Sequence, residues 1–459
     1  MADRDISPPL VKRRRVERSK PPDTQVQKLE RNDEAKSALP ISMRSRQTIR
    51  IFSWNINGIA PYLPLQSTAI ASFFKSSADP NKRPATNNNN TSTQPGSDNL
   101  RTFLSRHNWP AALFLQELKI QQGNDKALAA LLASLNSPLN GDDTLSDSRT
   151  YTLDGVLPRD KYNARGFQGR LYGVGTILRT DFVRRHVARV REVDWDLEGR
   201  VSIVELKPPP PEASTTTTTT TTTTTDSNNN NNNNNLVPAT TVLEQGQEED
   251  ERHRAAHQNK KQKKQPLALI NVYAVNGSAA PYRCPKTGAV AGTRHDRKLA
   301  FHAALRDECL ALERRGFRVV VAGDLNVARG PPDGHPSLRV FPRQHCANRA
   351  DFNAKFFAPE ENRRAGAYVA AAEEQEEGEQ EQEPFFDGVD VFRALHGLKR
   401  RYTYYPRTRA WGSSSDRVDM IIVSRRLWDE GRVRATGILD TPQERGRSDH
   451  VPLWVEVVV

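Results

Sequence analysis

The sequence predicts one large layered α/β domain, on the strength of three observations. Eight short runs rich in β-branched residues are typical of strands. Segments with helical periodicity lie between several of these runs, and alternating strands and helices favour an α/β layered fold. Long polar stretches of low complexity interrupt the 459-residue chain, so its length does not require several domains. We expect these stretches in surface loops, where a compact fold tolerates insertions.

The expected elements follow from the apolar patterns. Strands are expected at 50–56, 112–117, 172–178, 200–206, 267–274, 317–325, 416–423 and 451–459. Helices are expected at 66–76, 99–107, 124–135 and 294–316. In the last helix, Leu299, Ala303, Arg306 and Leu310 recur at a near-helical period, and Gly316 is a C-terminal stop signal. This pattern predicts a helix that ends at Gly316.

Several segments cannot bury a core, because their composition does not offset the entropy of ordering them. We expect a disordered basic tail over 1–48 and a folded domain over 49–459. Insertions without a core are expected at about 79–98, at 207–265 with its Thr and Asn runs, and at the acidic segment 372–383. The cluster VKRRRVERSK at 11–20 is typical of a nuclear-import or nucleic-acid-binding element, and equally of a solvated tail. A nuclear location is therefore an expectation that rests on this cluster alone.

Charge and cysteine content narrow the class of function. Lys and Arg number 67 against 55 Asp and Glu, and the net charge of +12 suits a polyanionic partner. The chain has no apolar run of about 18 residues, and its N-terminus has no apolar signal segment, so neither a membrane span nor secretion is expected. Cys284, Cys309 and Cys346 lack the spacing of a zinc site or a disulfide framework, which predicts a reducing compartment.

Polar residues stand where the expected strands end. An unpaired buried carboxylate is costly, so several of them at strand ends need an explanation. Oxygen donors with one imidazole and no thiolate are the ligands of a hard cation such as Mg²⁺. The residues in question are Asn55, Asn57, Glu117, Asp324, Asn326, Asp449 and His450.

This donor set suits the cleavage of a phosphodiester. Glu117 and Asp449 are candidates to hold Mg²⁺, which would polarise a phosphoryl oxygen. Asp324 is a candidate to orient or deprotonate a water molecule. A protonated His450 would offset charge on the phosphorus, with Asp419 as the carboxylate that keeps the imidazole charged. Singly, these residues could be a turn cap, a surface histidine and an Arg-paired aspartate; together they favour catalysis.

Five segments, taken in order, resemble the endonuclease/exonuclease/phosphatase superfamily, which has the deoxyribonuclease I-like fold. They are Asn55-Ile-Asn57-Gly58, Leu115-Gln-Glu117, Gly323-Asp324-Leu-Asn326, Arg417-Val-Asp419 and Ser448-Asp449-His450. A sixth segment resembles the exonuclease III-type apurinic/apyrimidinic endonucleases, whose equivalent strand ends in a Tyr within an Asn-x-Tyr pattern. It is Ile270-Asn271-Val-Tyr273-Ala-Val-Asn276-Gly277.

The resemblance implies a four-layered α/β sandwich, with two packed sheets flanked by helices and the site at one rim. It implies Mg²⁺ as the cofactor, with Mn²⁺ as the alternative ion. The implied metal-binding residues are Asn55, Glu117, Asp324, Asn326, Asp449 and His450. The implied catalytic residues are Tyr273, Asp324, Asn326, Asp419 and His450. We expect substrate contacts from Asn57, Lys119 and Tyr404, the last as part of an aromatic wall with Tyr402 and Tyr405.

The function implied by the resemblance is Mg²⁺-dependent DNA phosphodiester cleavage in base-excision repair. The enzyme would cut DNA 5′ to an abasic site and would also trim 3′ ends. Asp416, directly before the Arg-x-Asp motif, and the long segment Gly277–Arg294 favour an alternative. That alternative is a related phosphodiesterase for DNA ends, RNA or a small phosphoester. The basic charge leaves open a catalytically silent nucleic-acid-binding module. The sequence indicates no particular protein partner.

Overall fold

The computed structural model describes residues 47–63, 99–124, 126–139, 145–163, 166, 169–208, 265–366 and 384–459. Most of the expected tail at 1–48 lies outside these residues, as do the expected insertions at about 79–98 and 372–383. Of the expected insertion at 207–265, only residues 207, 208 and 265 are described. The expected helix at 66–76 also lies outside them.

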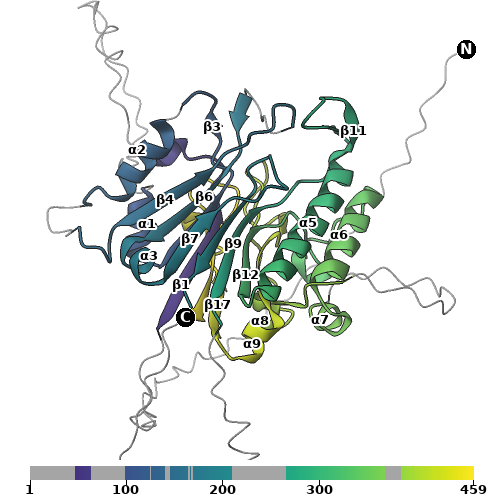
Figure 1. The fold of residues 1–459 in the computed structure, drawn as a ribbon. Helices are drawn as coiled ribbons and strands as arrows, with labels where there is room; N and C mark the ends of the chain where they lie inside the picture. Colours follow the sequence, from purple (N-terminus) through teal and green to yellow (C-terminus); the bar gives the residue numbers. More distant parts are fainter. Residues whose placement is uncertain are drawn as a thin grey trace, which may run out of the picture. The chain divides into compact units, whose positions relative to one another are not determined.

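The described strands form two six-stranded sheets that pack face to face (Figure 1). The first sheet has the order β17 (Val433–Ile438), β18 (Leu453–Val458), β1 (Thr48–Asn55), β2 (Ala112–Gln116), β6 (Val174–Arg179) and β4 (Tyr151–Val156). The second has the order β14 (Gly388–Asp390), β16 (Asp419–Ser424), β12 (Arg318–Asp324), β9 (Leu267–Tyr273), β8 (Val201–Leu206) and β7 (Val187–Arg191). Each sheet has one parallel pair of strands, β1 with β2 and β9 with β12.

Apolar side chains fill the space between the sheets. Ile51 and Phe114 of the first sheet belong to the same buried cluster as Leu269 and Val320 of the second. These residues alternate with side chains on the outer faces, as the two-residue period of a strand requires. This shared apolar core therefore packs the two sheets against each other, with the parallel strand pair of each sheet beside it.

Helices cover the two outer faces (Figure 1). α1 (Leu100–Arg106) and α2 (Lys126–Leu135) pack on the first sheet through Phe103 and Leu131. α5 (Arg294–Arg314) and α6 (Arg343–Phe356) pack on the second sheet through Phe301 and Phe352. The layers are thus helix, sheet, sheet and helix, which confirms the predicted four-layered α/β sandwich.

The smaller elements lie in the connections. The short helices are α3 (Thr180–His186), α7 (Pro359–Arg364), α8 (Val391–His396), α9 (Arg425–Asp429), α10 (Pro442–Arg445), η1 (Ala60–Tyr62) and η4 (Pro331–Asp333). The two-stranded pairs are β3 (Ile120–Gln121) with β5 (Arg170–Leu171), β10 (Pro281–Arg283) with β11 (Val290–Thr293), and β13 (Gly334–His335) with β15 (Ser415–Asp416). None of the helices within the described ranges is long and apolar enough to cross a membrane.

All eight expected strands are present, and their ends differ from the predictions by a few residues. The helix predicted over 294–316 is confirmed as α5, which begins with a capping box formed by Thr293 and Asp296. The buried apolar stripe of α5 runs through Phe301, Leu305, Cys309 and Leu312. Leu299, Ala303 and Leu310 are only partly buried.

Candidate active site

The carboxyl ends of the parallel strands bring the site together. Asn55 at the end of β1 lies opposite Gln116 at the end of β2. In the second sheet Asp324 lies opposite Tyr273 on one side and opposite Asp419 on the other. Gly323 allows this close approach, because a Cβ there would lie 1.9 Å from the carbonyl oxygen of Val272. Neighbouring strand ends therefore present polar side chains at one rim.

Four of the predicted residues have a left-handed backbone at these strand ends. The φ angles are 56° at Asn57, 55° at Glu117, 50° at Lys119 and 52° at Asn326. Non-glycine residues rarely adopt this conformation, and it persists only where the surrounding structure enforces it. The turns after β1, β2 and β12 are therefore built to aim particular side chains rather than to minimise local strain.

Asn55 links three strand ends through its buried amide. Its Nδ2 lies 3.1 Å from Oε1 of Glu117, 3.0 Å from Oδ2 of Asp324 and 3.5 Å from Nε2 of His450. Its Oδ1 accepts a hydrogen bond of 3.1 Å from the backbone N–H of Asn57. One side chain thus holds both sheets together at the rim.

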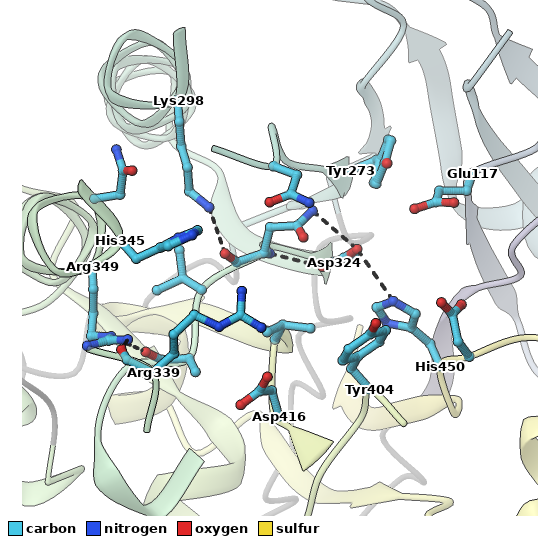
Figure 2. A pocket seen from close by; sticks show the side chains of 17 residues that line it. Glu117, Tyr273, Lys298, Asp324, Arg339, His345, Arg349, Tyr404, Asp416 and His450 are labelled. Atoms are coloured by element: carbon cyan, nitrogen blue, oxygen red, sulfur yellow. Dashed lines mark hydrogen bonds and ion pairs between the residues drawn. The ribbon is translucent and has the colours of Figure 1, made fainter. Parts of the chain in front are cut away.

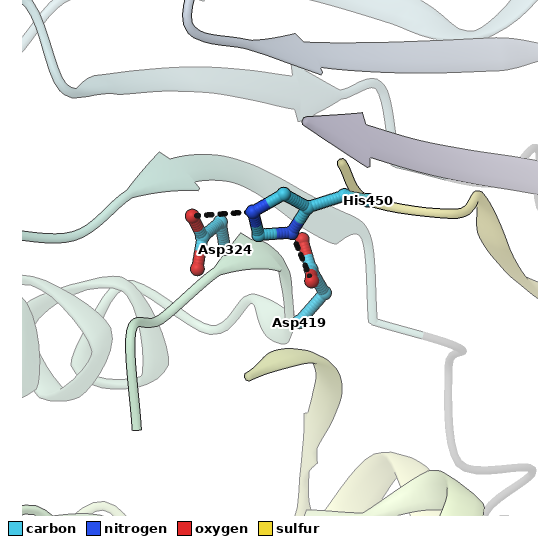
Figure 3. Close-up of side chains that lie close together, drawn as sticks. All are labelled: Asp324, Asp419 and His450. Carbon is cyan, nitrogen blue, oxygen red and sulfur yellow. Dashed lines mark hydrogen bonds and ion pairs between the residues drawn. The ribbon is translucent and has the colours of Figure 1, made fainter. Parts of the chain in front are cut away.

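His450 lies between two buried aspartates (Figure 3). Its Nδ1 is 2.7 Å from Oδ2 of Asp419, and its Nε2 is 4.0 Å from Oδ2 of Asp324. Asp419 is fully buried, and only 1% of Asp324 is exposed. The backbone N–H of Asn326 donates to Oδ1 of Asp324 over 2.9 Å, and the Asn326 side chain donates to the carbonyl of Ala274 over 3.0 Å. Asp324 is therefore fixed by its own turn.

Ser448 sets the position of His450. Its hydroxyl donates to the carbonyl of Asn55 over 2.6 Å and accepts the backbone N–H of His450 over 3.0 Å. The indole N–H of Trp54 donates to the carbonyl of His450 over 3.1 Å. Ser448 was part of the sequence motif but received no role there. Its function here is to tie the histidine loop to the end of β1.

The carboxylates of the cluster favour the protonated form of the His450 imidazole. Together they leave an excess of negative charge in the cluster. Burial alone would lower the pKa of His450, but Asp419 and Asp324 outweigh it and raise that pKa. Burial, followed by the charges of Asp419 and Glu117, raises the pKa of Asp324. The pKa of Glu117 is lowered because Lys119 and His450 outweigh the effect of its burial. A cation near these carboxylates would relieve their mutual repulsion.

The cluster opens into a cleft of about 260 Å³ (Figure 2). The predicted site residues that line it are Glu117, Tyr273, Asp324, Asn326, Tyr404, Asp449 and His450, whereas Asn57 and Lys119 are not among its lining residues. Asp419 lies beneath His450 and does not line the cleft, and Asn55 is fully buried. His345, which the sequence analysis left without a motif, also lines the cleft.

The predicted substrate-binding residues take three different positions. The Lys119 ammonium contacts Oε2 of Glu117 at 2.6 Å and donates to Oδ1 of Asn57. The Tyr404 ring lies 5.0 Å from the His450 ring, and Tyr404 lines the cleft. Tyr405 stacks on Trp411 at 3.8 Å and is buried, so it does not extend the aromatic wall into the cleft.

The basic residues opposite the carboxylates were not found from the sequence. These residues are Lys298 on α5, Arg339 in the loop before α6, and Arg349 on α6. They line the cleft together with Asn276 and Asn348. Lys298 lies inside the α5 pattern, where it looks like an ordinary helix lysine. Arg339 and Arg349 belong to a segment without a recognisable motif. Only the packing of α5 and α6 on the second sheet reveals that they face the site.

The residues present fit a divalent metal ion. Carboxylates of Glu117, Asp324 and Asp449 line one cleft, and donor atoms of Asp324, Asp419 and His450 lie within 4.8 Å of one another. Oδ1 of Asp419 is buried and has no hydrogen-bond partner within the described ranges. Oxygen-rich donors with an excess of negative charge suit a hard cation. Nδ1 of His450 forms a hydrogen bond with Asp419, and Nε2 is the ring nitrogen that faces Asp324.

The fold and this cluster define a metal-dependent enzyme that cleaves phosphate esters. The chain belongs to the endonuclease/exonuclease/phosphatase family, whose model matches residues 52–450. No curated protein matches the sequence.

Three solved structures resemble the fold at low sequence identity. The catalytic domain of Xenopus laevis APE2 is 16% identical with a TM-score of 0.48, and the match covers 89% of this chain and 92% of that one. The AP endonuclease LMAP of Leishmania major is 16% identical with a TM-score of 0.46, over 92% and 93%. The 3′ phosphatase NExo of Neisseria, bound to a product DNA hairpin, is 16% identical with a TM-score of 0.43, over 89% and 99%.

Proposed function

We propose that the protein is a Mg²⁺-dependent DNA phosphodiesterase of the exonuclease III type that acts in base-excision repair. It cuts 5′ to an abasic site, leaves a 3′-hydroxyl and also trims 3′ ends. The observation that carries the proposal is the arrangement of Asp419, His450 and Asp324, with a 2.7 Å bond on one side of the imidazole. The ordered motifs described above, including the Asn271-Val-Tyr273 pattern, support the exonuclease III branch.

Each residue has a part in this reaction. Asp324 orients the attacking water and accepts its proton, while Asn326 keeps the Asp324 carboxylate in place through its backbone N–H. Asp419 keeps His450 protonated, and the imidazolium faces the phosphate and stabilises the charge that develops on it. Tyr273, with a hydroxyl pKa raised by burial, remains a neutral hydrogen-bond donor to the phosphate.

We assign the metal and substrate contacts as follows. Glu117 and Asp449 would hold Mg²⁺, or Mn²⁺ in its place, with Asn55, Asp324 and Asn326 as further oxygen donors. His450 was also predicted to bind the metal, but as a protonated imidazolium it has no free lone pair for an ion. Such an ion would polarise a phosphoryl oxygen of the substrate. Lys119 and Asn57 contact the phosphate, and Tyr404 packs on the sugar or base beside His450.

Cleavage of an abasic duplex in the presence of Mg²⁺ tests the proposal. The wild-type protein will cut 5′ to the abasic site, and Asp324→Asn and Glu117→Ala will lose at least about 100-fold in kcat, since each removes a group that acts on the reacting atoms. A wild-type protein that leaves the duplex intact would refute it. DNA binding that survives EDTA without hydrolysis of any substrate would instead support a binding module.

Asp416 favours a second candidate, a related phosphodiesterase for another substrate. Its carboxylate lines the cleft, and its backbone pairs with that of Tyr404, where it would face a sugar or a base. We propose to compare turnover on abasic DNA, blunt DNA, single-stranded RNA and inositol phosphates. A clear preference for RNA or inositol phosphates would exclude the role in DNA repair.

A nuclear location is a separate proposal that rests on residues 11–20, outside the described residues. Deletion of these residues from a fluorescent fusion of the full chain will abolish its nuclear enrichment. Unchanged enrichment would contradict the proposal.

A further inference from the structure

The two sides of the cleft differ in charge (Figure 2). One side holds the carboxylates and the imidazole of the reaction centre. The other holds Lys298, Arg339 and Arg349, which come from α5, from the loop before α6, and from α6. Asp416 is the carboxylate on this second side, so two fixed positive charges of the arginines and the amine of Lys298, whose pKa burial lowers to about 7, stand against one negative charge. The reaction itself, as proposed, does not use these cations.

Lys298 is a buried ammonium without a carboxylate partner. Only 2% of the residue is exposed, and its Nζ donates to the backbone carbonyl of Asn326 over 2.6 Å. Among the described residues no carboxylate forms an ion pair with this nitrogen, and the charge of Asp324 acts on it from a greater distance. A buried charge with so little compensation is costly, and an anion in the cleft would offset that cost.

Arg339 has an uncommitted guanidinium at the same side of the cleft. The residue is exposed, and within the described ranges its side chain forms no hydrogen bond or ion pair with another residue. Its backbone, however, is fixed, because Nη2 of Arg349 donates to its carbonyl over 2.6 Å. Nε of Arg349 donates to the carbonyl of Ala328 over 2.6 Å, and only 4% of Arg349 is exposed. Arg349 thus braces the loop that presents Arg339.

We propose that Lys298, Arg339 and Arg349 form a subsite for a second phosphate group of the substrate, beside the phosphate that is cleaved. This inference rests on the proposed function. A guanidinium matches two phosphate oxygens with two parallel N–H donors, and the buried ammonium adds a second charge-assisted bond. Burial and the neighbouring Arg339 lower the pKa of His345 to about 4, so the fixed positive charge here comes from the two arginines.

The second phosphate has two possible sources, a neighbouring linkage of the same strand or a terminal phosphate. A dithymidine substrate with one phosphodiester separates them when it is compared with three derivatives. One carries a 5′-terminal phosphate, one a 3′-terminal phosphate, and one a further thymidine joined through a second phosphodiester. A matched trinucleotide with a neutral methylphosphonate at that second linkage isolates the effect of the charge.

The readout is the ratio of kcat/KM with and without the second charged phosphate. For the wild-type protein we expect a ratio of at least about tenfold, the value of one charge-assisted hydrogen bond. Arg339→Ala will bring the ratio close to one, and Arg339→Lys will keep part of it. Arg363→Ala, which changes an exposed arginine on α7 that does not line the cleft, will keep the wild-type ratio. The derivative with the largest ratio identifies the source.

A wild-type ratio near one for every derivative would overturn the subsite while leaving the proposed function intact. The same holds if Arg339→Ala keeps the full ratio, since this exposed side chain can be removed without disturbing the core. A wild-type protein that cleaves none of these substrates and no abasic duplex would refute the proposed function, and the subsite with it. The salt dependence gives an independent check. For Arg339→Ala the slope of log kcat/KM against log salt will be smaller by about one, and an unchanged slope counts against the subsite.

Discussion

The pair formed by Asp419 and His450 allows a quantitative test of the proposed mechanism. Asp419→Asn keeps the shape of the side chain and removes its charge. The lost interaction is a buried bond of 2.7 Å between a carboxylate and an imidazolium, worth about 3 kcal/mol at the upper end for charged groups. Since about 1.4 kcal/mol corresponds to tenfold in rate, kcat will fall about 100-fold. KM will change little, because the imidazolium acts on charge that develops in the transition state.

The chain contains a matched control for this substitution. Nδ1 of His302 lies 2.8 Å from Oδ2 of Asp351, which is the same pairing outside the cleft. Burial lowers the pKa of His302 to about 4 despite Asp351, because Lys298 and Lys355 oppose a positive charge there. Several carboxylates around His450 instead raise its pKa to about 10. Asp351→Asn therefore removes a bond to a neutral ring and will change kcat by less than about threefold.

Single-turnover cleavage at neutral pH and saturating Mg²⁺ measures the rate constant of the chemical step for Asp419→Asn, Asp351→Asn and the wild type. Circular dichroism verifies that both variants are folded. The reasoning is refuted if Asp419→Asn retains kcat within about threefold of wild type. It is also refuted if Asp351→Asn loses as much activity as Asp419→Asn. In either case the charge state of the imidazole does not control the reaction.

Further substitutions and conditions test the fold and the metal. Asp390→Asn will cost about 3–5 kcal/mol in urea unfolding, since it leaves Arg329 and Arg417, at 2.9 and 2.7 Å, without their shared buried partner. Its exposed control, Glu360→Gln, will cost no more than about 0.5 kcal/mol. Because the folded-state pKa of Asp390 is lowered, its contribution to the free energy of unfolding is present above the ordinary carboxyl pKa and is lost as pH falls. The difference in stability between the wild type and Asp390→Asn must therefore become smaller in acid. Gly323→Ala will destabilise by about 1–3 kcal/mol or more, because its Cβ would lie 1.9 Å from a carbonyl oxygen of β9, and wild-type stability in this variant would contradict that contact. Chelation will abolish cleavage, and Mg²⁺ or Mn²⁺ will restore it; activity that persists in EDTA would exclude the metal.

Local patterns were sufficient to find the strands and the polar residues that end them. Asp324 and Glu117 follow short apolar runs, and an apolar run with a polar end can be recognised without knowledge of the rest of the chain. The packing face of α5 could not be found in this way. The helix buries Phe301 against the second sheet and leaves Leu299 only partly buried.

The basic side of the cleft shows the same limit more strongly. Arg339 and Arg349 stand in a segment with no motif, and only the path of the chain from β12 to α6 brings them opposite the carboxylates. Ser448 was visible in a motif, yet its role depends on a 2.6 Å bond to the carbonyl of Asn55, 393 residues away in the chain. Such contacts have no signature in the spacing of residues.

The sequence by itself determined the layered α/β class, the family motifs and the kinds of side chain available for chemistry. Each of these depends on residues that are close together in the chain, where periodicity and turn preferences act directly. The tertiary structure decided the bond between Ser448 and Asn55, the left-handed turns that aim Glu117 and Asn326, and the cationic side of the cleft. Those features depend on sheet register and on the packing of layers, which are fixed only when segments far apart in the chain bury their apolar faces together.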